Sequence, residues 1–304
     1  MKSLNFAIAL FLAAAASAAG AQDAVKPDAR LGPPAAGATT PPVTVPGVTV
    51  TARRPHSATL EEASRQYVES HVVEAPIAHH LLRWQDPICP MTAGLPAAYN
   101  AFISQRVLNT AKAIGAPVAD PHKPCRTNVL IVFTTEPQAY LDEIATKHPQ
   151  LLGWHYASQT HRLKSFNHPI ESWYVTASKT EGGDEQVDSV WGNGENVTPY
   201  NSTLVRALIV VDWNKAQDFE VGTIGDYVAM LTLSQPHRAA VATCNDLASI
   251  LDLLSDNCAE TDKPKGLTEP DLAFLKALYD IDPRKRTEFA RQAIARRVVD
   301  ALKH

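Results

Sequence analysis

Residues 203–213 read TLVRALIVVDW, and this stretch decides the fold class. Its run of β-branched and apolar side chains predicts a buried strand. A second stretch of the same kind, NVLIVFTT, lies at residues 128–135. Almost all of the chain after residue 213 has the apolar spacing of helices. The two strands and the helical C-terminal half together predict an α+β fold, with a central mixed sheet packed by helices.

The other elements are predicted from periodicity and from capping residues. Residues 171–179 alternate apolar and polar side chains, as in a strand with one solvated face. Helices are predicted where apolar residues recur every three or four positions after a capping residue or a proline. They cover residues 59–70, 96–114, 136–147, 215–234, 246–253, 268–279 and 283–303. The sequence Gly-Asn-Gly at residues 192–194 predicts a turn.

Residues 1–21 have the pattern of a secretory signal peptide. Lys2 supplies the positive charge, residues 6–16 are apolar, and Ala-Gly-Ala at residues 19–21 is a small-residue cleavage site. The apolar run is shorter than the ~20 residues of a transmembrane helix, and no later stretch approaches that length. We therefore predict a periplasmic or secreted protein that is cleaved after Ala21 and has no transmembrane segment.

Proline divides the rest of the chain into two parts. Residues 22–58 are rich in Pro and Ala, which predicts a disordered linker because Pro removes backbone donors and favours extended conformations. Residues 59–304 are predicted to form a single α+β domain, since a chain with 45% hydrophobic and 20% charged residues can bury a sizeable core. The formal net charge of -4 disfavours nucleic acid as a partner.

The chain has four cysteines, an even number for a compartment that permits disulfides. Three pairings are possible, and we favour Cys89–Cys125 and Cys244–Cys258 because each pair encloses one coherent segment. The alternative is a zinc site with four thiolates, which the absence of Cys-x-x-C spacing disfavours. We therefore predict two disulfides, no free thiol for nucleophilic chemistry, and no metal or other cofactor.

Several motifs resemble those of an uncharacterised family of exported proteobacterial proteins that is distantly related to the zincin metallopeptidases. The motifs are W-x-D-P-I-C-P at residues 84–90, P-C-x-x-N at 124–128, VFT at 132–134, GDYVAM at 225–230, L-x-SILDLL at 247–254 and LT-x-x-D-x-x-FLKALY at 267–279. The order of elements, with a long helix directly after strand 203–213, is similar to the zincin layout. The resemblance implies a zincin-like fold over most of residues 80–300.

A zincin carries two histidines four residues apart on this long helix, with a glutamate between them as general base. The resemblance places Asp226, Tyr227 and Met230 at these positions, and Pro236 or His237 near the third ligand. A phenol, a thioether and one carboxylate do not build a tetrahedral zinc site. The resemblance therefore implies a degenerate zincin without its HExxH motif, and we predict a non-catalytic binding protein in which Tyr227 and Met230 are either core or binding residues.

Two candidate sites remain open. Asp226 is either an acid, base or ligand-orienting group, or a carboxylate that is satisfied by an arginine or a backbone N–H. The second site is an aromatic-rich loop that fits a metal, a peptide or a glycan, or is a plain surface loop. Its members are Trp154, His155, His161 and His168. We expect a cleft between helix 215–234 and loop 151–170, and the alternative function is a peptidase-like hydrolase that uses Asp226 or this loop, with His161 as the candidate catalytic histidine.

Three further segments bear on partners. Residues 48–54, VTVTARR, resemble the segment that opens the plug of TonB-dependent receptors, and are either a strand for β-addition or a chance match. The basic helix at 283–303 either contacts a membrane or presents a solvated face. The pair His79 and His80 is a weaker candidate. The expected partner is an unidentified cell-envelope protein or a peptide or glycan ligand, and a partner-binding envelope factor is the third function considered.

Overall fold

The computed structural model describes residues 59–75, 79–153, 163–182, 185–187, 201–237 and 244–304. All of them belong to one compact unit of the chain, Val48–His304. The signal peptide and linker predicted for residues 1–58, and the turn predicted at 192–194, lie outside the described residues.

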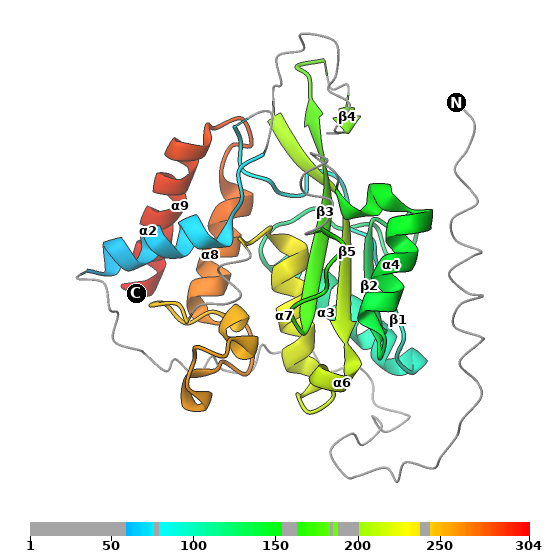
Figure 1. Cartoon of the computed structure of the whole chain (residues 1–304). Helices are drawn as coiled ribbons and strands as arrows, with labels where there is room; N and C mark the ends of the chain where they lie inside the picture. Colours follow the sequence, from blue (N-terminus) through cyan, green and yellow to red (C-terminus); the bar gives the residue numbers. More distant parts are fainter. Residues whose placement is uncertain (1–58, 76–78, 154–162, 183–184, 188–200, 238–243) are drawn as a thin grey trace, which may run out of the picture. The chain divides into compact units, whose positions relative to one another are not determined.

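The described strands form a mixed five-stranded sheet in the order β1-β2-β5-β3-β4 (Figure 1). The strands are β1 Pro90–Ala93, β2 Val129–Thr134, β3 Ile170–Lys179, β4 Glu185–Val187 and β5 Asn201–Asp212. β1, β2 and β5 are parallel, whereas β3 is antiparallel to β5 and β4 is antiparallel to β3. The two stretches predicted to be buried strands are β2 and β5, and they pair at the centre with Ile131 opposite Ile209.

Both faces of the sheet are covered, which explains the near-continuous apolar sequence of β2 and β5. Ile131 and Ile209 point into the main core, on the side where α3 and α7 pack against each other. Leu208 and Val210 alternate with them and are buried outside that core. The helix α4 and the 3-10 helix η1 contact β5, and η1 also contacts β3.

The described helices are α2 Leu60–His71, α3 Ala97–Ala113, α4 Pro137–Lys147, α6 Trp213–Ala216, α7 Val221–Leu233, α8 Glu269–Asp280 and α9 Thr287–Leu302. Three 3-10 helices accompany them: η1 Pro149–Leu152, η4 Ile250–Leu254 and η5 Glu260–Asp262. α9 contacts both α2 and α8, so the first described helix lies beside the last (Figure 1, blue and red). With its mixed sheet and helical C-terminal half, the described chain has the predicted α+β class.

The helix predicted at residues 215–234 is two helices. The Asp212 side chain caps α6, because its Oδ1 accepts a hydrogen bond of 3.1 Å from the Asn214 N–H. The Phe219 N–H then donates to the Ala216 carbonyl, and the extended Glu220 precedes α7. The segment predicted as a helix at 246–253 begins only after Ser249 and is the 3-10 helix η4.

Both predicted disulfides are present. Cys89 and Cys125 have a Cα–Cα distance of 6.1 Å, and Cys244 and Cys258 one of 5.1 Å. The Asn128 side chain makes two hydrogen bonds next to the first disulfide. Its Oδ1 accepts from the Cys89 N–H at 2.8 Å, and its Nδ2 donates to the Pro87 carbonyl at 3.0 Å. The motifs at residues 84–90 and 124–128 therefore fasten the start of β1 to the start of β2.

Candidate functional site

Helix α7 holds the site residues that the resemblance singles out, and it lies in the core. Every residue from Thr223 to Leu233 is buried, and the helix contacts β5, α3 and η4. The apolar side chains of α7 are distributed around all sides of the helix, which is typical of a helix that is buried in the protein. Its predicted site residues therefore pack against other elements and do not line an open cleft.

Asp226 is bound by an arginine of the neighbouring helix α3. Arg106 donates from Nε to Oδ1 at 2.5 Å and from Nη2 to Oδ2 at 2.8 Å. The Leu267 N–H lies 3.3 Å from Oδ2, and a Cβ on Gly266 would lie 2.9 Å from the same oxygen. The hydrogen bond that Arg106 donates to Asp226 raises the pKa of Arg106. Of the two interpretations of Asp226, the structure therefore shows the one in which an arginine satisfies the carboxylate.

The other helix positions offer no metal ligands either. Tyr227 and Met230 are fully buried in the main core. Burial raises the pKa of Tyr227 well above its usual value, and its hydroxyl has no hydrogen-bond partner among the described residues. His237 is exposed, and its backbone N–H donates to the Ser70 carbonyl at 2.9 Å. A neutral phenol, a thioether and a carboxylate that is already bound by Arg106 do not fit the zinc ion of a zincin.

The histidine-rich loop is described only at its end. Trp154, His155 and His161 lie outside the described residues. His168 is partly buried, with its Nδ1 2.9 Å from the Ile170 carbonyl oxygen and its Nε2 without a partner in the described chain. This histidine belongs to the turn before β3.

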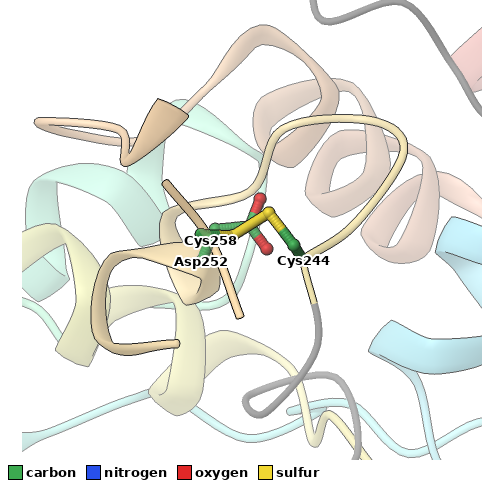
Figure 2. A group of neighbouring side chains, drawn as sticks. All are labelled: Cys244, Asp252 and Cys258. Atoms are coloured by element: carbon green, nitrogen blue, oxygen red, sulfur yellow. A yellow bond between two sulfur atoms is a disulfide. The ribbon is translucent and has the colours of Figure 1, made fainter. Parts of the chain in front are cut away.

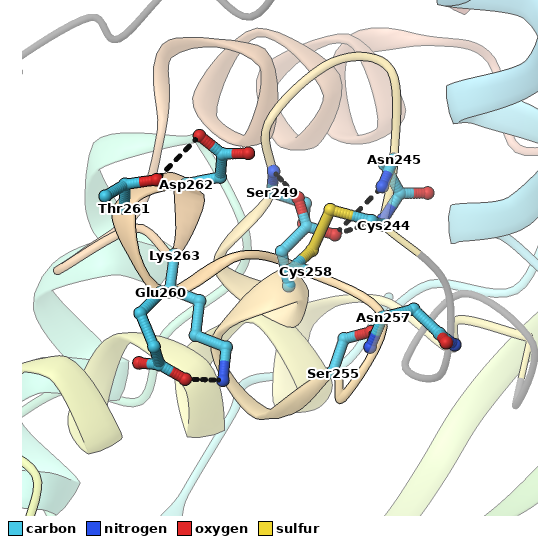
Figure 3. The surroundings of a disulfide bond; sticks show 11 residues. Cys244, Asn245, Ser249, Ser255, Asn257, Cys258, Glu260, Thr261, Asp262 and Lys263 are labelled. Atoms are coloured by element: carbon cyan, nitrogen blue, oxygen red, sulfur yellow. Dashed lines mark hydrogen bonds and ion pairs between the residues drawn. A yellow bond between two sulfur atoms is a disulfide. The ribbon is translucent and has the colours of Figure 1, made fainter.

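One group of three potential metal ligands occurs among the described residues, namely Cys244, Asp252 and Cys258 (Figure 2). Its two sulfurs form a disulfide, so it contains no thiolate. Asp252 accepts hydrogen bonds from Asn245 Nδ2 at 2.7 Å and from the Ser249 N–H at 3.0 Å (Figure 3). The group is therefore a structural disulfide beside a hydrogen-bonded carboxylate, and it does not fit a metal ion.

A buried polar cluster that the sequence did not predict joins α2, η4 and α8. His71 Nε2 lies 3.0 Å from Ser249 Oγ, and Ser249 Oγ donates to Asp271 Oδ1 at 2.7 Å. Tyr67 also donates to Asp271, and its ring stacks on His71 with centroids 3.8 Å apart. The capping box Thr268–Asp271 was visible in the sequence, but the partners of Asp271 from other elements were not.

This cluster does not have the arrangement of a hydrolase triad. In a triad the histidine lies between the serine and the carboxylate, whereas here Ser249 lies between His71 and Asp271. All three residues are 0% exposed, so no substrate reaches them. Burial lowers the pKa of His71 to about 3 and raises the pKa of Asp271, which is the expected direction for a cluster with a structural role.

A polar groove lies between α2 and the start of α9. Its volume is about 470 Å³, and its eleven lining residues come from α2, from the segment that follows α2, and from residues 286–292. All eleven are polar, and they include four glutamates and three arginines. The sequence did not indicate this groove, because nothing in the spacing shows that the two helices pack together.

Comparison of the chain with protein-family models, with curated proteins and with solved structures finds no match in any of the three. Within the described residues, no helix has both the length and the apolar character that are needed to cross a membrane.

Proposed function

We propose that this protein is an exported, non-catalytic binding protein of the cell envelope, built on a zincin-like layout that has lost its metal centre. One observation carries the proposal. At the position where the resemblance requires the first zinc ligand, Asp226 is buried and closed by a bidentate bond from Arg106. A carboxylate that is neutralised in this way is neither a free metal ligand nor a free general base.

The layout around Asp226 supports the same proposal. α7 comes after β5, with only the short helix α6 between them, which is similar to the helix after a strand in zincins, and it packs on α3. The next two positions, Tyr227 and Met230, add to the core. The helix keeps its structural role, and the chemistry that its residues supply is packing and one ion pair.

Two observations support export. Residues 1–21 have the composition of a signal peptide, and the two disulfides are typical of proteins from an oxidising compartment. The proposed location is the periplasm or the cell exterior, with cleavage after Ala21. Mass spectrometry of the protein from the periplasmic fraction tests the cleavage site directly.

The function is tested by metal analysis combined with hydrolysis assays. We expect the protein purified from the periplasm to contain far less than one zinc per chain, and to cleave neither casein nor peptidoglycan, with or without added zinc. Stoichiometric zinc, or hydrolysis that a chelator abolishes, would contradict the proposal. Asp226→Asn and His161→Ala are then the variants to assay, because loss of hydrolysis in either, in a variant that circular dichroism shows to be folded, would establish the hydrolase alternative.

A further inference from the structure

The groove between α2 and α9 contains charges of both signs, and only some of them form ion pairs with one another. Glu62 pairs with Arg65, and Glu74 pairs with His79. Four other lining groups have no ion pair within 4.0 Å among the described residues, namely Glu69, Glu288, Arg286 and Arg291. Two cations and two anions therefore share a groove of about 470 Å³, yet lie too far apart to pair directly.

Main-chain contacts fix the walls of the groove. The His79 carbonyl accepts hydrogen bonds from the Thr287 N–H at 3.1 Å and from Thr287 Oγ1 at 2.9 Å. His79 has a φ of 52°, an unfavourable conformation for a residue with a side chain, and this contact holds it there. Arg291 donates from Nη2 to the Val72 carbonyl at 3.3 Å, while its buried Nε has no partner in the described chain. A preformed site loses less conformational entropy when a ligand binds.

The composition of the lining narrows the ligand class. Among the described residues, the lining has no aliphatic side chain and no aromatic ring other than the His79 imidazole. Its apolar surface comes from the methylene groups of polar side chains, which offer no ring face for stacking on a sugar. Four glutamates against three arginines repel a polyanion. No lining residues form a group of three metal ligands. Charges of both signs favour a small molecule that carries both a carboxylate and an ammonium group.

We propose that the α2–α9 groove binds short peptides with free termini, with the carboxylate held by Arg286 and Arg291 and the ammonium group held by Glu69 and Glu288. This inference rests on the proposed function and names the ligand class of the binding protein. A peptide of two to four residues spans roughly 7–14 Å when extended, so a series of peptide lengths tests how far apart the two sets of charges lie. Its amide groups match the glutamine side chains that also line the groove.

The test is isothermal titration calorimetry of the full disulfide-bonded protein with alanine peptides of two to four residues. Each peptide is used with free termini, with an acetylated N-terminus and with an amidated C-terminus. We expect saturable binding of a free peptide, and a loss of roughly tenfold or more in affinity on blocking either end, because each blocked end loses its hydrogen bonds to charged groups. Equal binding of the free peptide and of either blocked form would overturn the inference.

The variant Arg286→Gln tests whether Arg286 binds the carboxylate of the peptide. We expect this variant to bind the free peptide roughly tenfold more weakly and to bind the C-terminal amide as the wild type does, because the amide has no carboxylate to lose. Arg296→Gln is the matched control, since Arg296 is exposed on the same helix and outside the groove. An equal loss in both variants would show that the effect is one of general charge and would also overturn the inference.

The same samples separate this inference from the proposed function. Peptides that bind and remain intact by mass spectrometry support both. Peptides that bind in the groove and are hydrolysed would leave the site in place but overturn the non-catalytic function. Absence of binding by an intact, metal-free and inactive protein would overturn the groove and leave the proposed function standing.

Discussion

At the scale of single residues, the pair Arg106–Asp226 is the most consequential contact. The Asp226 side chain is 4% exposed and that of Arg106 is 26% exposed, so water screens the pair only weakly. Removal of one partner from a buried pair costs more than the pair itself contributes, because the remaining charge is left without compensation. The pair ties α3 to α7 and, through the Leu267 N–H, to the loop before α8.

We predict that Asp226→Asn lowers the free energy of unfolding by about 3 kcal/mol, because Arg106 then keeps a half-buried charge without a carboxylate. Urea unfolding with intact disulfides measures the change. Asp282→Asn is the control, since its pair with Arg284 is exposed and screened by water, and its loss should change stability far less. Equal effects of the two substitutions would contradict a structural role for Asp226.

His71 makes stability depend on pH. Burial lowers its pKa from 6.5 to about 3. Below pH 6.5 the His71 imidazole therefore binds a proton in the unfolded chain but not in the folded chain. Stability is therefore lost as pH falls from 6.5 towards 3, by about 1.4 kcal/mol per pH unit. Asp252 acts in the opposite direction, because burial raises its pKa from 3.8 to about 6 and the folded chain binds its proton more tightly.

The prediction concerns the difference between wild type and His71→Gln. The variant loses the stacking on Tyr67 and is less stable at about pH 7, but it lacks the acid-sensitive imidazole. Between about pH 7 and pH 4.5 it should gain about 3 kcal/mol relative to the wild type. Urea unfolding at both pH values measures this gain, and a constant difference would show that His71 does not titrate as described.

At the scale of elements, the two disulfides close chain segments of different length. The bridged cysteines are 36 residues apart in the first pair and 14 in the second. Because a longer loop loses more freedom on closure, the first bridge should stabilise the fold by about 4 kcal/mol and the second by about 3 kcal/mol. The second bridge also lies beside Asp252, which organises the start of η4.

We therefore predict that the double variant Cys89→Ser/Cys125→Ser unfolds at lower urea concentration than Cys244→Ser/Cys258→Ser. The expected order follows from loop length, and the comparison is made at one pH with otherwise identical samples. A peptide map of the unreduced wild-type protein provides the check on pairing. Linkage of Cys125 to Cys244 would refute the arrangement on which the prediction depends.

The elements that the sequence predicts well are those whose apolar pattern and capping residues lie within the element itself. β2, β5 and α8 were predicted because their apolar runs and caps lie within the elements themselves. β1 and β4 were missed, since strands of four and three residues exist only because a neighbouring strand pairs with them. The break between α6 and α7 could not be predicted from periodicity, because Phe219 within it keeps helical spacing from Ala216.

The site residues follow the same logic. The sequence left the role of Asp226 open, and its partner Arg106, 120 residues away, is a property of the packing of α3 on α7. The groove and the cluster around Ser249 combine residues that are far apart in the chain. No spacing within one segment carries that information.

At the scale of the whole molecule, the fold closes by contact between its first and last described helices. Lys303 Nζ lies 2.9 Å from a carboxylate oxygen of Glu61, and Arg291 reaches the Val72 carbonyl at the other end of α2. α9 also buries Ile294 and Val298 in the main core. Each such side chain contributes about 2 kcal/mol on burial, so α9 as a whole accounts for a large share of a net stability of about 5–15 kcal/mol.

We predict that a chain beginning at Val48 melts within about 2 °C of the complete one, because the described fold lies within Val48–His304. A chain that ends at residue 286, and so lacks α9, should show no cooperative melting transition. Near-ultraviolet circular dichroism follows both. A cooperative transition in the shortened chain at an unchanged temperature would show that α9 is dispensable.

The contact between α2 and α9 also constrains when the protein folds. Because α2 has its neighbour more than 200 residues later in the chain, it stays without that cover until α9 has been made. The core therefore cannot be completed progressively from the first helix onward, and its last step is the docking of α9 on α2 and α8.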